Sequence, residues 1–256
     1  MDTAAHTTIN VTRDDEFEGL ATITLTRPEK LNAIDYVMHG ELQDACAALA
    51  GDTDIRVVIL TGEGRAFSSG NDLRAGKRPR AKNDLERRYR MASGNRTSDA
   101  IASLPQVTIA AVNGLAVGGG VVLAAAADMR LAAESAWFSI PEVDLDLPMT
   151  WHSLPLLMRE LGPARTKELV MTCDRFSAQQ AERWGFVNHV YPDGRVLDEA
   201  RALAKKLLAK DQLSLATTKS GTNALANMMV PREATYSDAE LLLLAEIMAR
   251  RRAERG

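Results

Sequence analysis

Residues 107–123 read VTIAAVNGLAVGGGVVL, and this stretch decides the fold. Its first six residues form a continuous apolar run, which is typical of a β-strand covered on both faces. The consecutive glycines Gly118, Gly119 and Gly120 then leave backbone N–H groups bare at the start of an apolar helical pattern. A strand that passes through a glycine turn into a helix predicts one unit of an α/β fold.

A second glycine turn follows another strand pattern upstream. Residues 56–62 read RVVILTG and predict a buried strand, and residues 62–73 continue as GEGRAFSSGNDL. Two such turns on adjacent strands would aim two N–H groups at one oxygen atom, which is the geometry of an oxyanion hole. Close packing of a helix against a strand also explains glycines at these positions, so the residues alone leave both explanations open.

The chain divides into an α/β part and a helical part. Residues 21–26 alternate apolar side chains with threonine and predict a strand, and residues 35–50 predict a helix with one apolar side. Because strand and helix patterns alternate, we expect a mainly parallel α/β core over residues 1–194. Residues 195–256 contain helical patterns only, over 195–210, 212–229 and 233–252. The apolar run at 241–247 is expected to pack against the core or a neighbouring subunit.

Composition excludes several classes of protein. The chain has 256 residues, 46% of them hydrophobic and 25% charged, with a net charge of −3, so no basic excess points to nucleic acid. No apolar run reaches the roughly 18 residues of a membrane span, and the N-terminus lacks a signal-peptide pattern. Cys46 and Cys173 lie far apart in the sequence, so we expect no disulfide and a cytoplasmic location.

Motifs for other chemistries are missing from the sequence. The glycine turns match neither the P-loop nor the dinucleotide-binding fingerprint nor the G-x-S-x-G nucleophile elbow. The four histidines form no ligand pair, so no metal site is expected. One carboxylate stands out, because Glu142 follows Pro141 in an apolar stretch. It is either an exposed residue at a sheet edge or a buried acid/base with a raised pKa.

Four segments together resemble the enoyl-CoA hydratase/isomerase, or crotonase, superfamily. They occur in the order and spacing of that family: ITLTRPEKLNAI (23–34), VVILTGEGRAFSSGNDL (57–73), TIAAVNGLAVGGGVVLAAAADMRLAAESAWFSIPEV (108–143) and LVMTCDRFSAQQAERWGFVNHVYP (169–192). The resemblance implies a crotonase-like α/β spiral of ββα units. It also implies a helical C-terminal oligomerisation region that builds homo-trimers, often paired into hexamers.

The resemblance also implies roles for individual residues. The family binds the enolate of an acyl-CoA thioester between two backbone N–H groups, which here belong to Asn71 and Gly119. One catalytic glutamate of the family's hydratases maps onto Glu142, whereas the position of the second is Val122. Coenzyme A is part of the substrate, and no separate cofactor is implied. The residues implied to contact this substrate are Lys30, Leu31, Ala33, Ser69, Asp72, Leu73, Val122 and Pro141.

Two segments depart from the family pattern. Residues 143–161 read VDLDLPMTWHSLPLLMREL in place of a glycine-rich stretch, and they introduce Trp151 and His152. Either side chain would line the acyl pocket or simply begin a helix, and His152 is a possible catalytic group. Residues 74–90 are rich in Lys and Arg. They form either a lid over the CoA phosphates or a solvated helix.

The single glutamate favours one reaction over the others. One carboxylate suffices to move a proton from C2 to C4 of a bound dienolate, whereas hydration usually needs a second carboxylate to activate water. We therefore expect Δ3-Δ2 enoyl-CoA isomerisation. The alternatives are an enoyl-CoA hydratase/lyase that uses Glu142 alone and a non-catalytic acyl-CoA-binding protein. No nucleic-acid or membrane partner is expected.

Overall fold

The computed structural model describes residues 6–75, 81–235 and 237–253. Its larger sheet has six strands in the order β1-β2-β3-β5-β7-β10. β1 is antiparallel to β2, and the remaining neighbours are parallel, as expected of an α/β core. The strands are β1 (Ile9–Arg13), β2 (Leu20–Leu25), β3 (Val57–Gly62), β5 (Val107–Val112), β7 (Met129–Ala133) and β10 (His189–Tyr191).

The smaller sheet has four strands in the order β4-β6-β8-β9. β4, β6 and β8 are parallel neighbours, and β9 is antiparallel to β8. The two glycine-rich turns identified in the sequence continue beyond β4 and β6, so both reach the carboxyl end of this sheet. The strands are β4 (Ala66–Ser68), β6 (Leu115–Val117), β8 (Trp137–Ser139) and β9 (Phe176–Ser177).

The chain repeats one supersecondary unit three times. In each repeat it passes from a strand of the larger sheet to a strand of the smaller sheet and then into helix, as in β3-β4-α2-α3, β5-β6-α4 and β7-β8-α5. This is the expected succession of ββα units. α5 breaks at Gly162, whose φ is 72°, just before Pro163. The helices of these units are α2 (Asp84–Met91), α3 (Ser93–Ala102), α4 (Gly119–Ala126) and α5 (Ser153–Thr172).

Both faces of the larger sheet are covered, which explains its continuous apolar strands. Along β3, Val58 and Leu60 pack into the main core with helix α1 (Tyr36–Ala50). Val57 and Ile59 point to the opposite face and pack with helix α7 (Val196–Leu208). Because neighbouring strand residues face opposite sides, a strand buried on both sides must be apolar throughout. Every residue of β3 and β5 is buried, as predicted.

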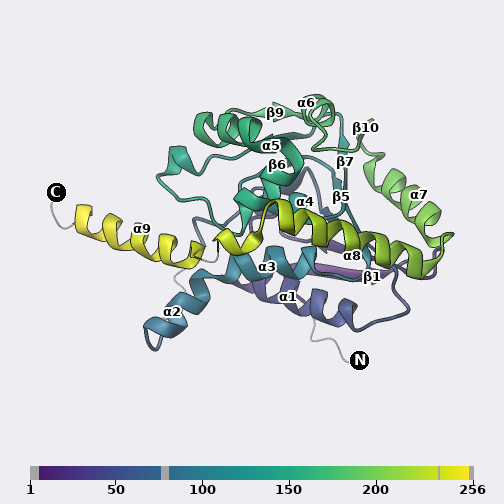
Figure 1. Cartoon of the computed structure of the whole chain (residues 1–256), viewed down its shortest axis with the longest axis horizontal. Coiled ribbons are helices and arrows are strands. Elements are labelled where there is room, and N and C mark those ends of the chain that lie inside the picture. Colours follow the sequence, from purple (N-terminus) through teal and green to yellow (C-terminus); the bar gives the residue numbers. More distant parts are fainter. Residues whose placement is uncertain (1–5, 76–80, 236, 254–256) are drawn as a thin grey trace.

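The C-terminal part is helical, with α7 followed by α8 (Gln212–Met229), a 3-10 turn η3 (Arg232–Thr235) and α9 (Asp238–Ala253). Figure 1 shows α8 lying across the body of the molecule and α9 extending beyond it. The prediction of one helix over residues 233–252 is wrong at its beginning. Tertiary contact sets the start of α9, because the Asp238 carboxylate accepts the backbone N–H of His152 at 3.0 Å.

Three short elements complete the described structure: η1 (Pro28–Lys30), η2 (Val143–Leu145) and α6 (Ala178–Arg183). α6 begins at a capping box in which Ser177 and Gln180 exchange hydrogen bonds between side chain and backbone. None of the helices in the described ranges is both long and apolar enough to cross a membrane.

Candidate active site

The two glycine turns meet at the carboxyl end of the smaller sheet. A Cβ added at Gly70 would lie 2.4 Å from the carbonyl oxygen of Val117 and 2.9 Å from the backbone nitrogen of Gly119. A Cβ at Gly120 would lie 2.3 Å from the carbonyl oxygen of Ser68. Both glycines are therefore required for direct backbone contact between the turns. The structure thus brings the Asn71 and Gly119 segments together, as the sequence predicted.

The backbone around each turn leaves an N–H directed away from the sheet. Ile34 donates to the carbonyl of Gly70 at 2.8 Å and accepts from Asp72 at 2.9 Å, so the intervening N–H of Asn71 points to the other side. Gly119 is the first residue of α4, where N–H groups have no acceptor within the helix. Gly118 before it has φ 52° and ψ −118°, a conformation open essentially to glycine.

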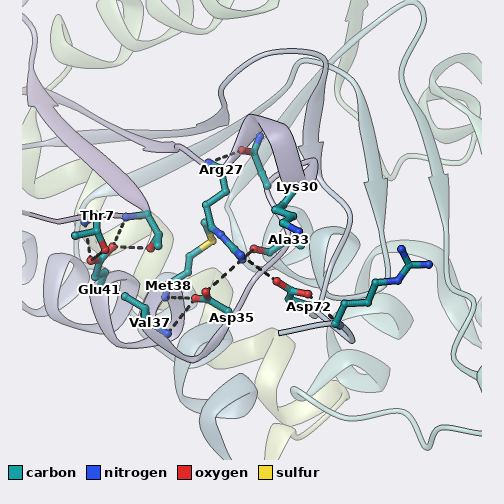
Figure 2. Close-up of polar contacts among 12 residues, drawn as sticks. Thr7, Arg27, Lys30, Ala33, Asp35, Val37, Met38, Glu41 and Asp72 are labelled. Carbon is teal, nitrogen blue, oxygen red and sulfur yellow. Dashed lines mark hydrogen bonds and ion pairs between the residues drawn. The ribbon is translucent and has the colours of Figure 1, made fainter. Parts of the chain in front are cut away.

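An arginine ties the first turn to the loop before α1. The Arg27 guanidinium lies 3.0 Å from the carboxylate of Asp72 and 3.4 Å from that of Asp35, and it donates to the carbonyl of Ala33 (Figure 2). The side chains of Arg27 and Asp72 are 15% and 9% exposed, so water screens the pair weakly. This network fixes the turn that carries Asn71.

The residues that the resemblance assigns to coenzyme A lie beside the same turn. Ser69 donates its backbone N–H to the carbonyl of Leu31 at 2.9 Å, and its hydroxyl lies 3.3 Å from the carbonyl of Lys30. Ser69 lines the pocket at the meeting point of the two turns, whereas Lys30, Leu31 and Ala33 do not. These three residues lie outside the pocket lining, and Lys30 and Leu31 contact Ser69.

A pocket of about 1240 Å³ opens at the meeting point of the turns. Its walls come from both turns, from α2, α3 and α9, and from the loop after β8. Nine residues identified from the sequence line it: Ser69, Asn71, Asp72, Leu73, Gly119, Val122, Pro141, Glu142 and Trp151. Part of the Lys- and Arg-rich segment lies outside the described residues, and Arg87 and Arg90 of its helical part α2 line the pocket.

Glu142 stands at the inner wall, next to the second turn. Its Oε1 lies 3.0 Å from the position that a Cβ on Gly118 would occupy. Its Oε2 is buried with no hydrogen-bond partner among the described residues. Burial raises the pKa of this carboxyl, and a hydrogen bond from its own backbone N–H opposes the rise in part. Of the two explanations that the sequence left open, the structure shows a buried carboxyl with a raised pKa and not an exposed residue at a sheet edge.

Two of the other carboxylates on the described pocket wall have cationic partners. Asp72 pairs with Arg27, and Glu246 of α9 lies 2.8 Å from the guanidinium of Arg87. Glu142 differs from both, because its carboxyl has no cationic partner among the described residues and burial raises its pKa. Val122, on the first turns of α4, presents an apolar side chain to the same pocket and is 3% exposed.

The loop after Glu142 places Trp151 and His152 differently. Trp151 lines the pocket, whereas His152 is not among the lining residues and its Nδ1 lies 3.1 Å from the Asp99 carboxylate. The same oxygen of Asp99 accepts a hydrogen bond from Arg232 at 3.1 Å. His152 therefore belongs to a polar cluster behind the pocket wall. Among the described residues, no group of three His, Cys, Asp or Glu side chains is placed to hold a metal ion.

Several pocket residues were not identified from the sequence. His39 lies on the buried face of α1, Gly94 lies on α3 and Leu242 lies on α9, and all three line the pocket. His39 shares the helical spacing of the core residues Met38 and Leu42, so its position gives no functional signal. Gly94 carries no motif. Only the docking of α3 and α9 against the loop after β8 brings these residues to the site.

Comparisons with known proteins find relatives with the same fold. Residues 15–256 match the family model described as enoyl-CoA hydratase/isomerase. A probable enoyl-CoA hydratase of Mycobacterium bovis is 38% identical over 205 residues, which cover 78% of this chain and 72% of that protein. The crystal structure of an enoyl-CoA hydratase/isomerase from Xanthobacter autotrophicus is 32% identical, with a TM-score of 0.85 over 94% of this chain and 88% of that one.

A second solved structure comes from a protein with a more specific title. A monofunctional enoyl-CoA isomerase from Mycobacterium smegmatis is 31% identical, with a TM-score of 0.73 over 86% of this chain and 94% of that one. These likenesses confirm the expected spiral fold. The matched range 15–256 includes Asn71, Gly119 and Glu142.

Proposed function

Because the chain belongs to the enoyl-CoA hydratase/isomerase family, we propose that its pocket binds an acyl-CoA thioester and converts Δ3-enoyl-CoA to Δ2-enoyl-CoA. One observation carries the choice of reaction. Glu142 is a pocket carboxylate whose buried Oε2 has no hydrogen-bond partner among the described residues, and Val122 is apolar at the position where the family's hydratases hold a second glutamate. A site with one base can move a proton along the substrate without activating water.

The oxyanion hole consists of the N–H groups of Asn71 and Gly119. The thioester carbonyl oxygen lies between them and accepts both hydrogen bonds. Negative charge develops on this oxygen when the C2 proton leaves, so preorganised donors lower the barrier to enolate formation. The close approach of Gly70 to the second turn supports this pairing, because it keeps the backbones of the two turns in direct contact.

Glu142 carries the proton. Its carboxylate takes a proton from C2 of the Δ3-enoyl thioester, which leaves a dienolate whose charge is spread from the carbonyl oxygen to C4. The protonated Glu142 then returns the proton to C4, and the double bond ends between C2 and C3. The raised pKa of the Glu142 carboxyl matches it better to a weakly acidic carbon than an ordinary glutamate. No proton is gained or lost overall, and no cofactor is consumed.

The remaining predicted residues position the substrate. Ser69 lines the pocket and contacts Lys30 and Leu31, and these residues with Ala33 would hold the coenzyme A portion. Asp72 and Leu73 line the pocket next to Asn71, and Pro141 flanks Glu142. Residues 1–194 would thus supply the thioester site, and residues 195–256 the helices that wall it and join subunits.

Hydration is the second candidate. It is favoured by the names of relatives, among them the probable hydratase of Mycobacterium bovis and a crotonyl-CoA hydratase of Syntrophomonas wolfei, which is 34% identical over 207 residues. In this reaction Glu142 alone would position and deprotonate water for attack at C3 of a Δ2-enoyl thioester.

A turnover screen separates these candidates. Four- and six-carbon Δ3-enoyl-CoA thioesters should gain the absorbance of a conjugated thioester, whereas crotonyl-CoA should lose it slowly, with products identified by mass. We expect isomerisation to be faster than hydration. Hydration as fast as isomerisation would overturn the proposal in favour of a hydratase. Tight binding without turnover of any thioester would overturn it in favour of a non-catalytic acyl-CoA-binding protein.

We also infer that the chain forms a homo-trimer or hexamer in the cytoplasm. Four apolar side chains of α8 are exposed in the single chain: Leu213, Leu225, Met228 and Met229, by 64 to 82%. Large apolar side chains that are exposed together are typical of a surface covered by a partner. Sedimentation at micromolar concentration should show a trimer or a hexamer, and a stable monomer would contradict this assembly. The buried free thiols Cys46 and Cys173 suit a reducing compartment.

A further inference from the structure

The indole of Trp151 is wedged between two glycines. A Cβ added at Gly94 would lie 1.9 Å from Cδ1 and 2.0 Å from Nε1 of the indole. A Cβ added at Gly119 would lie 2.4 Å from Cζ3 and 2.6 Å from Cη2. The five-membered ring therefore rests on the backbone of α3 and the six-membered ring rests on the backbone of α4. Any side chain at Gly94 or Gly119 would have to displace the ring.

The backbone of Trp151 is held as firmly as its ring. Its N–H donates to Asn95 at 3.2 Å, and its carbonyl accepts from the Ser98 hydroxyl at 2.7 Å. Both partners belong to α3. The residue has φ 63°, a left-handed conformation that costs energy outside glycine and persists only where surrounding contacts fix it. The ring also packs edge-on against His39, with centroids 4.8 Å apart. The indole is thus a rigid part of the wall.

This position puts the ring next to the reacting carbonyl. If Gly119 donates its N–H to the thioester oxygen, as proposed above, the carbonyl carbon lies within a few ångströms of the Gly119 backbone. The six-membered ring is packed on that same backbone. An acyl chain that continued from the carbonyl carbon toward Trp151 would therefore meet the indole.

We propose that Trp151 sets an upper limit on the acyl group and restricts the site to short-chain acyl-CoA thioesters. Gly94 acts through it, because the lack of a side chain at Gly94 is what lets the ring sit back against α3. This inference rests on the proposed function of the same pocket. It assigns Trp151 as a specificity-determining residue and Gly94 as its positioning residue.

The test compares two saturated ligands, butyryl-CoA and decanoyl-CoA, by calorimetry on the full chain, so that binding is measured without turnover. The wild type should prefer butyryl-CoA. Trp151→Ala should shift the ratio of the two dissociation constants toward decanoyl-CoA by at least about ten-fold, the usual minimum effect of space for added methylenes in an apolar pocket. Trp151→Phe should shift it less, and it provides the test if Trp151→Ala does not fold.

Gly94→Ala supplies a second, independent arm. The added methyl must push the indole toward the pocket, so binding of butyryl-CoA should weaken by about ten-fold. In the Trp151→Ala background the same change should have little effect, because the ring that it displaces is gone. The matched control is Gly40→Ala, since Gly40 also lies on a helix and a Cβ there meets nothing within 4 Å.

The outcomes distinguish a failure of the proposed function from a failure of this inference. If no acyl-CoA binds to any of these proteins, the proposed function and this inference both fail. If acyl-CoA binds but the ratio for decanoyl-CoA and butyryl-CoA is the same with and without the indole, the proposed function stands and this inference is overturned. In that case the acyl chain leaves past the α2 side of the pocket. Additive effects of Gly94→Ala and Trp151→Ala would equally overturn the role of Gly94.

Discussion

The guanidinium of Arg27 lies 3.0 Å from the carboxylate of Asp72, and this ion pair joins two loops that are distant in sequence. One loop leads into α1, and the other carries Asp72 (Figure 2), directly after Asn71 in the sequence. Both side chains are largely buried; Asp72 has Arg27 as its cationic partner, whereas Arg27 also lies 3.4 Å from the carboxylate of Asp35. The position of a backbone donor in the pocket is therefore controlled by a side chain that does not line it.

Replacing Arg27 with glutamine should destabilise the protein and weaken catalysis together. Loss of the guanidinium leaves Asp72 buried without its cation, which costs about 3 to 5 kcal/mol of unfolding free energy. The displaced turn should lower kcat/KM by about ten-fold or more, because a misplaced donor no longer fits the developing charge. Urea unfolding and steady-state kinetics measure both. The control Arg13→Gln removes an arginine from the exposed pair with Asp52 and should cost at most about 1 kcal/mol. Equal costs would contradict the structural role of Arg27.

Glu142→Gln should abolish most turnover while leaving acyl-CoA binding intact. A positioned acid/base contributes about 10² to 10⁴ in rate, and the glutamine amide can neither take up nor release the transferred proton. Burial raises the pKa of the Glu142 carboxyl, and the base is active only when ionised. The acid limb of the wild-type pH profile of kcat/KM should therefore lie at a higher pH than an ordinary glutamate would give. The control Glu134→Gln changes an exposed glutamate outside the pocket lining and should have no effect. Unchanged turnover in Glu142→Gln would remove this residue from the mechanism.

Val122→Glu should raise the ratio of hydration to isomerisation. The new carboxylate would share the pocket with Glu142, and like charges at short range raise the pKa of one of them. One acid and one base then face the substrate, as hydration requires. Stability should fall by a few kcal/mol, because an imperfectly paired polar group is buried. Val122→Gln matches the size without the charge and should not gain hydration. Crotonyl-CoA hydration that stays at the wild-type level in Val122→Glu would contradict this interpretation of Val122.

Glu41→Gln should destabilise the protein at neutral pH but not in acid. The Glu41 carboxylate accepts hydrogen bonds from the backbone and hydroxyl groups of Thr7 and Thr8 (Figure 2). Burial alone would raise its pKa, but these hydrogen bonds outweigh burial and lower it. A lowered folded-state pKa means that the stabilisation is present above the unfolded-state pKa and disappears as the pH falls through the folded-state value.

The difference between wild type and Glu41→Gln should therefore be about 1 to 2 kcal/mol near pH 7 and should shrink near pH 3. Urea unfolding at both pH values measures it. The exposed Glu18 gives a control, since Glu18→Gln should leave the unfolding free energy unchanged within about 0.5 kcal/mol. A difference in unfolding free energy that grows in acid would contradict a lowered pKa of Glu41 in the folded state.

The sequence was most informative where local backbone geometry constrains the residue type. Gly70 and Gly118 have positive φ, and a Cβ there would meet a neighbouring turn or the Glu142 carboxylate, so glycine is required. The glycine pattern predicted the two turns, but it left an oxyanion hole and close helix–strand packing as alternatives, and only the family resemblance favoured the oxyanion hole. Buried strands such as β3 likewise require apolar residues at every position. The capping residue Asp35 and the helix after it followed the same local rules.

Features that depend on tertiary docking were not predictable. The role of Gly94 depends on an indole from a loop distant in sequence, and helical periodicity gives no sign of it. The start of α9 at Asp238 depends on the backbone N–H of His152 in the same way. His152 itself was a possible catalytic residue because a histidine in an unusual loop allows that role, yet its ring lies behind the pocket wall.

The repeated ββα order has a consequence for the growing polypeptide. Asn71 follows a strand of one unit, and Gly119 follows the neighbouring strand of the next unit. The two donors become neighbours only when β4 and β6 have paired, and pairing between parallel strands closes a long loop and is slow. A nascent chain that has emerged only as far as α3 holds one of the two N–H groups. The pocket also takes part of its wall from α9, so its lining is complete only when this last helix has left the exit tunnel.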